Sequence, residues 1–293
     1  MPPAEPAVPF FRLSGAGNDF LALVEPERVP GPSTIAAWCR RGVSLGADGL
    51  FVLRRAGEAD AAGQAAVTMD HYNPDGGLAE LCVNGTRCAA RLAFHLGWAE
   101  DEIEVRTGAG PVRAWAAGED AIGLALGPPP AAEETTVDLT AEEGGERGGE
   151  RIAGWRVAVG VPHFVVPWPD LGRAPVARLG PPLRRHPDFG AAGTNVDFVR
   201  FGARGRLDIR TFERGVEAET LACGTGVLAA AAVGRATGAL DFPAAARTAG
   251  GFEMTVGEDG GRWTLAGDAR ILAAGEILPG AAARLAAPSW GTG

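Results

Sequence analysis

The feature that most constrains the fold is a pattern repeated around two cysteines, Cys82 and Cys223, one in each half of the chain. In each copy an alternating apolar and polar run leads into a glycine-containing turn, an Ala-Glu pair, the cysteine, a glycine and a helical stretch. The first copy is VTMDHYNPDGGLAELCVNGTRCAARLAFHLGW (67–98), and the second is LDIRTFERGVEAETLACGTGVLAAAAVGRATGA (207–239). Internal similarity on this scale indicates two related domains with one cysteine each.

The periodicity predicts a strand before each cysteine and a helix after it. Apolar and polar residues alternate over 67–72 and over 207–212, as in a half-buried strand. After Cys82 apolar residues recur every four positions, and Gly97 stands where a helix C-cap is expected. After Cys223 the run VLAAAAV is apolar on all sides, which predicts a central helix enclosed by sheet.

Composition excludes several classes of function. The chain of 293 residues has a net charge of -9 and a pI near 5.1, so it would repel nucleic acid. Neither a signal peptide nor an apolar stretch long enough to cross a bilayer is present. We therefore expect a cytoplasmic protein without a nucleic-acid or membrane partner.

The four cysteines do not form a recognisable framework. Without an export signal a disulfide scaffold is not expected, and without CxxC spacing no zinc site is expected. We assign Cys39 and Cys88 to the core, because a free cysteine commonly behaves as a small buried hydrophobe. The same interpretation is open for Cys82 and Cys223, but their matched surroundings favour a reactive role.

Two cysteines at helix starts suggest proton transfer. Unpaired N–H groups and the helix dipole lower a thiol pKa from about 8.5 to roughly 3.5–7.5 and also attract a carboxylate. Two such helix starts facing each other would hold one carboxylate between two sulfurs. A thiolate could then remove the α-proton of an amino acid while the opposite thiol returns one. This chemistry needs no metal, pyridoxal or other cofactor.

The cysteine motifs resemble those of the diaminopimelate epimerase family. The resemblance spans most of the chain in family order, through the blocks GAGNDF (15–20), GADGL (46–50), YNPDG (72–76), AELCVNGTRC (79–88), VGVPHFVV (159–166), TNVDFV (194–199) and ERGVEAETLACGTG (213–226). It implies interconversion of LL- and meso-diaminopimelate, on the route to lysine and peptidoglycan. It also implies a homodimer and domains that close on the substrate.

The implied fold is α/β (α+β), with two pseudo-symmetric domains, each a curled mixed sheet around a central helix. We expect the first domain at 1–127, completed by a C-terminal strand at about 272–285, and the second at 128–271. The Pro-, acidic- and Gly-rich segment 128–150 contains the expected link, and residues from about 281 resemble a loose tail.

The resemblance assigns roles residue by residue. It makes Cys82 and Cys223 the two bases, with His163 and Glu213 supporting catalysis. It makes the following residues substrate contacts: Asn18, Asn73, Val83, Asn84, Asn195, Glu213, Arg214, Gly224 and Thr225. Asp48 and Asp75 lie in glycine turns, and we interpret them as structural.

Two positions depart from the family pattern. Val83 stands where many members have glycine, although its backbone N–H is retained. Val161 stands where many members have an asparagine that contacts the far end of the substrate, and valine cannot make that hydrogen bond. Asn73, Asn195 and Arg214 could still do so, since arginine suits a carboxylate.

Three other functions stay open at this point. One is racemisation of another amino acid, such as histidine or hydroxyproline, on the same scaffold. The others are a thiol redox protein and a non-catalytic amino-acid-binding module. Retention of the distal contacts favours diaminopimelate, and the lack of CxxC spacing disfavours redox chemistry.

Overall fold

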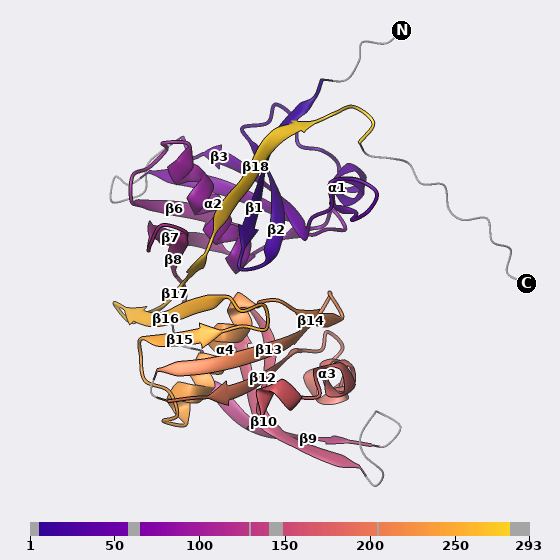
Figure 1. The fold of residues 1–293 in the computed structure, drawn as a ribbon, viewed down its shortest axis with the longest axis vertical. Coiled ribbons are helices and arrows are strands. Elements are labelled where there is room, and N and C mark those ends of the chain that lie inside the picture. The colour runs from indigo at the N-terminus through magenta and orange to yellow at the C-terminus, as the bar shows by residue number, and fades with distance from the viewer. Residues whose placement is uncertain (1–5, 58–64, 129, 141–148, 204, 282–293) are drawn as a thin grey trace, which may run out of the picture.

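The computed structural model describes residues 6–57, 65–128, 130–140, 149–203 and 205–281. The first half of the chain contains eight strands and two helices, in an order that the second half repeats (Figure 1). These elements are β1 (Val8–Gly15), β2 (Asn18–Val24), α1 (Pro32–Cys39), β3 (Gly49–Arg55), β4 (Ala66–Tyr72), β5 (Leu78–Ala79), α2 (Val83–His95), β6 (Glu102–Thr107), β7 (Gly110–Ala116) and β8 (Ala121–Ala125).

Within the described residues, the second half adds one strand at each end and two short 3-10 helices to the same pattern. Its elements are β9 (Ala132–Leu139), β10 (Glu150–Val159), β11 (Val161–Pro167), η1 (Leu171–Arg173), α3 (Val176–Arg184), η2 (Pro187–Phe189), β12 (Asn195–Phe201), β13 (Arg206–Glu213), β14 (Ala218–Thr220), α4 (Gly224–Ala236), β15 (Ala244–Arg247), β16 (Glu253–Asp259), β17 (Arg262–Asp268) and β18 (Arg270–Ile277).

The strand pairings of the two halves match. In the first half β1 pairs with β2, β3 with β4, β6 with β7 and β7 with β8, all antiparallel, while β2–β3 and β4–β6 are parallel. In the second half β11–β12 and β13–β15 are the equivalent parallel pairs. The mixed sheet of each half curls around one helix, which confirms the predicted fold class.

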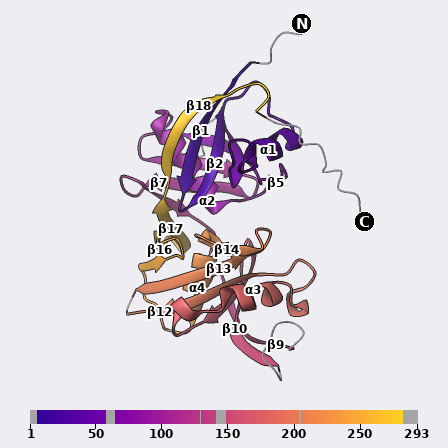
Figure 2. The same cartoon turned by 45° about the vertical axis from the view of Figure 1, so that its right-hand side comes forward.

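The chain passes between the halves twice. After β8 it enters the second half as β9, which pairs with β10, and after β17 it returns as β18, which pairs with β1. Strands β8 and β17 pair with each other and join the two sheets (Figure 1). Figure 2 shows the two halves from another side, with β17 where they meet. A domain division after residues 127 and 271 stays a prediction, because the sheet itself is continuous there.

The predicted link at 128–150 is more structured than we expect from its sequence. Residues 132–139 form β9, which supplies the outer strand beside β10. The rest of that acidic and glycine-rich segment (141–148), like the predicted tail beyond 281, lies outside the described residues.

Helices α2 and α4 fill the interiors of the two curled sheets. The central alanines of α4 are buried on every side, as its all-round apolar sequence predicts. Both helices end in the same glycine cap, with Gly97 and Gly238 at positive φ. The Gly97 N–H donates to Phe94 and the Trp98 N–H to Ala93, and equivalent bonds follow Gly238. The cap at Gly97 confirms the predicted end of α2.

Helices α1 and α3 cover the opposite faces of the sheets. The buried side chains of α1, including Ile35 and Trp38, form a small core with Leu21, Leu23 and Leu50. Leu179 and Leu183 of α3 form the equivalent core in the second half. Within the described residues, no helix has the length and apolar character needed to span a membrane.

Candidate active site

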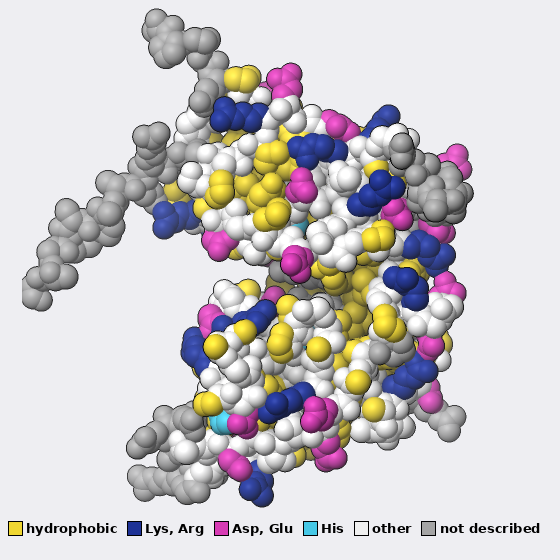
Figure 3. Space-filling model, turned by 180° about the vertical axis from the view of Figure 1, so that it is seen from behind, with side chains coloured by type: hydrophobic (Ala, Val, Ile, Leu, Met, Phe, Trp, Pro, Cys, Tyr) yellow, Lys and Arg dark blue, Asp and Glu magenta, His cyan; other side chains and the backbone are white. Residues whose placement is uncertain are grey.

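The two cysteines stand at the beginnings of α2 and α4. On one face of the molecule a notch separates the two halves (Figure 3). Each is the N-cap residue of its helix, with almost the same backbone conformation, φ −130° at Cys82 and φ −129° at Cys223. The Cys82 sulfur accepts from the Gly85 N–H at 3.4 Å, and Cys223 Sγ lies 3.4 Å from Thr225 Oγ1. All four cysteines of the chain are free thiols.

The two helix starts meet across the boundary between the halves. A Cβ added to Gly224 would lie 3.1 Å from Val83 Cγ1 and 3.3 Å from Asn84 Oδ1. The residue that follows one cysteine therefore contacts the residues that follow the other. Glycine is also required two residues later, because a Cβ at Gly226 would lie 2.6 Å from Asp197 Oδ1.

The thiols differ from our expectation in their acidity. The pKa of Cys82 is raised to about 11, chiefly by burial; the Gly85 N–H opposes this rise and the nearby Glu213 charge adds to it. Burial also raises the pKa of Cys223 well above its ordinary value, with Glu213 and Asp197 adding to the effect. We predicted that the helix starts lower the thiol pKa values, and for the protein without substrate this prediction is wrong. Loss of water around each sulfur raises the pKa more than the helix N–H groups lower it. Both thiols are neutral at pH 7.

A buried network lies behind Cys223. His163 Nδ1 is 2.7 Å from Asp197 Oδ2, and the Thr211 hydroxyl donates to the other oxygen of that carboxylate at 2.7 Å. His163 Nε2 is 3.4 Å from Asn195 Nδ2, and Asn195 Oδ1 accepts the Arg214 backbone N–H at 2.8 Å. The network thus connects His163 and Asn195 to the end of β13, where Glu213 and Arg214 lie.

Glu213 and Arg214 have unusual environments for charged residues. Burial raises the pKa of the Glu213 carboxyl, and the charges of Asp197 and of Asp48 from the other half act in the same direction. Among the described residues, no carboxylate lies within ion-pair distance of the Arg214 guanidinium. A guanidinium without a carboxylate partner could bind an anionic group of a ligand.

The first half carries an apolar version of the same network. The strand registers place Phe20 and Phe51 where the second half has His163 and Asp197. His71 packs edge-on against Phe20, and its Nδ1 has no hydrogen-bond partner in the described part of the chain. Burial lowers the pKa of His71 to about 4, so it is neutral at pH 7.

The polar contacts of the first half lie at the start of α2. Asn84 Nδ2 donates to Asn18 Oδ1 at 2.6 Å, and Asn18 Nδ2 donates to Asp48 Oδ2 at 3.2 Å. Asp48 also accepts from Arg41. Asn73 is different, since it is exposed in the turn after β4, where its backbone bonds to Gly77.

Two residues that sequence reasoning missed complete the site. Asp197 is fully buried in a strand of apolar residues, NVDFVRF, and an acidic residue in such a strand is the signal that could have revealed it. Arg87 is fully buried on α2 and donates to Asn84 Oδ1 at 2.7 Å. Asp75, in contrast, accepts only from Gly77 of its own turn.

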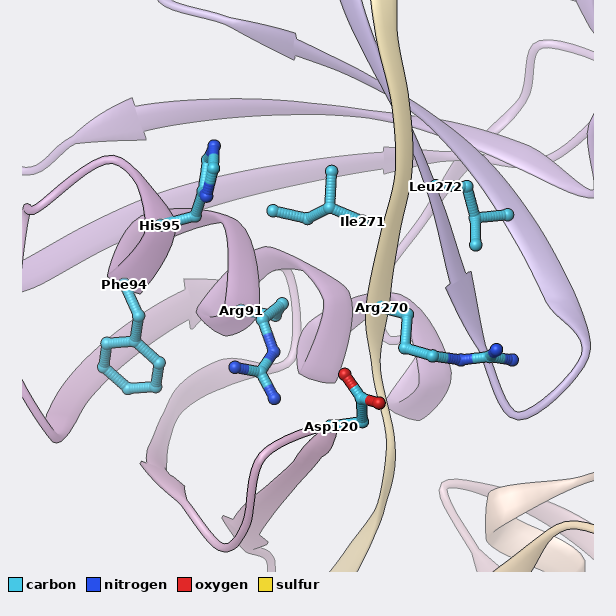
Figure 4. A pocket seen from close by; sticks show the side chains of 7 residues that line it. All are labelled: Arg91, Phe94, His95, Asp120, Arg270, Ile271 and Leu272. Carbon is cyan, nitrogen blue, oxygen red and sulfur yellow. The ribbon is translucent and has the colours of Figure 1, made fainter.

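The hollow shown in Figure 4 lies elsewhere. It has a volume of about 540 Å³ and lies between the end of α2, strand β18 and the β7–β8 turn. Its lining contains none of the predicted site residues; it consists of Arg91, Phe94, His95, Asp120, Arg270, Ile271 and Leu272. Within the described chain, no three His, Cys, Asp or Glu side chains group closely enough to hold a metal ion.

Comparison with known proteins gives one consistent family. The family model described as diaminopimelate epimerase matches residues 10–130 and 156–272. A protein of that name from Gemmatimonas aurantiaca is 36% identical over 285 residues, covering 92% of this chain and 98% of that protein. One from Aquifex aeolicus is 34% identical over 236 residues, covering 76% of this chain and 80% of that protein.

A solved structure shares the fold at lower identity. A probable proline racemase from Agrobacterium radiobacter K84 superposes with a TM-score of 0.67 and 18% identity, covering 94% of this chain and 95% of that one. At this identity the likeness concerns the fold alone.

Proposed function

Because the chain belongs to the diaminopimelate epimerase family, we propose that this isomerase interconverts LL- and meso-diaminopimelate by proton transfer between Cys82 and Cys223. The observation that carries the mechanism is the pair of equivalent helix starts, each capped by a cysteine and in contact with the other. This arrangement supports placing one sulfur on each side of a bound α-carbon.

The reaction conserves protons. A thiolate on one side takes the α-proton, the opposite thiol donates its proton to the other face, and the two sulfurs exchange charge. Because burial keeps both thiols neutral in the free protein, one must lose a proton to solvent before turnover. The positively charged amino group of the substrate favours that loss.

The helix starts lower the remaining barrier. The free N–H groups at the first turns of α2 and α4 can donate to the substrate carboxylate, on which negative charge builds as the α-proton leaves. Aimed donors in a site shielded from water stabilise such charge strongly. Positioned acid and base groups contribute about 10²–10⁴-fold in addition.

The buried network of the second half supports the rest of the site. Asp197 orients His163, which faces Asn195, and Asn195 in turn fixes the Arg214 backbone. We propose that Glu213 and Arg214 are thereby directed toward the substrate, with Arg214 binding the distal carboxylate. Val161 begins β11 and its side chain offers no hydrogen bond, so we propose Arg214, Asn195 and Asn73 as the distal contacts.

Incubation with LL-diaminopimelate in heavy water under reducing conditions tests the substrate. We expect α-proton exchange and formation of the meso isomer. A panel including histidine and hydroxyproline tests the alternative racemases. Exchange of one of these amino acids, without exchange of diaminopimelate, would overturn the substrate assignment.

Single cysteine variants test the mechanism. We expect Cys82→Ala and Cys223→Ala each to abolish epimerisation, because each removes one of the two proton carriers. Cys39→Ala is a matched control, since Cys39 is the buried last residue of α1 and belongs to a separate core. Full epimerase activity in either site variant would refute the two-base mechanism.

We also propose that the protein is a cytoplasmic homodimer acting in lysine and peptidoglycan precursor synthesis. Strand β18 supports the dimer, because within the described residues it pairs only with β1 and exposes Leu272, Ala273 and Ala274. The equivalent outer strand β9 instead exposes Glu133 and Glu134, and charged side chains discourage pairing of edges. Two antiparallel copies of β18 centred on Ala273 would place Arg270 opposite Glu276 of the second copy.

A further inference from the structure

A buried guanidinium lies beneath the first cysteine and has no role in the mechanism so far. Arg87 is fully buried, and its contacts are Asn84 Oδ1 at 2.7 Å and the Asp268 carbonyl at 3.3 Å. Its Nη1 has no partner within the described residues. Burying a cation without a carboxylate partner is costly, so the position requires an explanation.

The second half shows that the fold itself does not need this cation. Arg87 lies five residues after Cys82, and the residue five after Cys223 is Leu228. Leu228 is buried at the same position of the equivalent helix. A leucine at this place is therefore compatible with the helix, the cap and the surrounding sheet.

The contacts of Arg87 determine how two asparagine side chains are turned. A guanidinium can only donate hydrogen bonds, so Asn84 must direct its oxygen toward Arg87 and its NH₂ toward Asn18. Asn18 then accepts with its oxygen and directs its own NH₂ toward Asp48, a carboxylate that can only accept. With a donor at one end and an acceptor at the other, neither amide can flip without losing a bond.

This orientation leaves N–H donors for a ligand. Each NH₂ group has two hydrogens, and the bonds just described use one from Asn84 and one from Asn18. The second hydrogen of each amide has no acceptor among the described residues, so it could meet a carboxylate at the helix start. A flipped amide would present an oxygen there and would repel the carboxylate.

We infer that Arg87 is a positioning residue that holds the Asn84 and Asn18 amides with N–H groups toward the substrate carboxylate. The inference rests on the proposed epimerase function. It assigns Arg87 no contact with the substrate and no part in the proton transfer itself.

A double-mutant cycle separates this role from a general structural one. We expect Arg87→Met to lower kcat/KM for LL-diaminopimelate by about 10- to 100-fold, the loss typical of one hydrogen bond to a charged group. Asn84→Ala should cause a loss of similar size. Adding Arg87→Met to Asn84→Ala should then change kcat/KM by less than about threefold, because the coupled pair is already broken.

Arg91→Met is the matched control. Arg91 lies one turn further along α2 (Figure 4) and donates to the Ala269 carbonyl at 3.0 Å, next to the Asp268 carbonyl that Arg87 contacts; no hydrogen bond joins it to Asn84 within the described residues. We expect it to lower thermal stability while kcat/KM changes by less than about threefold. Arg87→Lys keeps a buried hydrogen-bond donor, so it should retain most of the wild-type kcat/KM. If Arg87→Met does not fold, Arg87→Lys replaces it in the double-mutant cycle.

The outcomes are distinct. Additive losses in the double variant, or Arg91→Met losses as large as those of Arg87→Met, would overturn the positioning role while leaving the epimerase function intact. Arg87→Lys as impaired as Arg87→Met would also count against it. Absence of turnover by the wild-type protein on LL-diaminopimelate would overturn the proposed function, and the inference with it.

Discussion

The acidity of Cys82 gives a quantitative test of the site. With a pKa of about 11, the thiolate fraction at pH 8 is about 10⁻³, whereas an ordinary thiol of pKa about 8.5 is about one quarter ionised. A thiolate of higher pKa is also more nucleophilic. Between pKa values of about 8.5 and about 11, this raises the reaction rate of the thiolate about tenfold and offsets part of the loss. We therefore expect Cys82 to react about 20-fold more slowly than a model thiol at pH 8, before any steric protection.

The measurement is the pH dependence of modification by a small thiosulfonate, quantified for each cysteine by peptide mass spectrometry. The Cys82 rate should rise about tenfold per pH unit from pH 6 to pH 10, because only the thiolate reacts. Cys39 provides an internal comparison for Cys82. Burial also raises the pKa of Cys39 to about 11, but Cys39 is not a helix N-cap residue. A rate that levels off below pH 8 would show that the helix start outweighs burial, and would refute our account of the free enzyme.

Three further predictions follow from other parts of the structure. His71 is held neutral, so the free energy of unfolding should fall by about 3 kcal/mol as pH falls from 6.5 to 4, and His71→Phe should flatten this slope in urea titrations. Mild oxidant should abolish activity by joining Cys82 to Cys223, with recovery on reduction; unchanged activity would mean that the sulfurs do not meet. Leu272→Glu should convert a dimer to a monomer in light scattering, whereas Val43→Glu, at another exposed position, should not.

The local elements of the cysteine motifs were predictable, because short-range patterns determine them. Alternation located β4 and β13, and the all-apolar run located α4. Strand β9 was not expected, since its sequence AEETTVDL is acidic and lies in a predicted link. It forms because its backbone pairs with the edge of β10. That pairing joins residues 132–139 to residues 150–157.

The electrostatics of the site could not be predicted in the same way. The sequence places both cysteines at helix starts, but their pKa depends on how much of the chain packs around them. The Asp197–His163 pair similarly depends on the register between β11 and β12, which brings together residues 34 positions apart. The catalytic and binding roles assigned by resemblance stay predictions until the variants are measured.

The return of β18 to the sheet of the first half has a consequence for synthesis of the protein. Because β18 lies beside β1, the first sheet lacks its last strand until residues 270–277 have left the ribosome. An N-terminal fragment would keep the edge of β1 open, a surface prone to pair with other chains. Completion of the first half therefore waits until the second half has been made, and removal of residues 270–277 should damage the half of the protein that was made first.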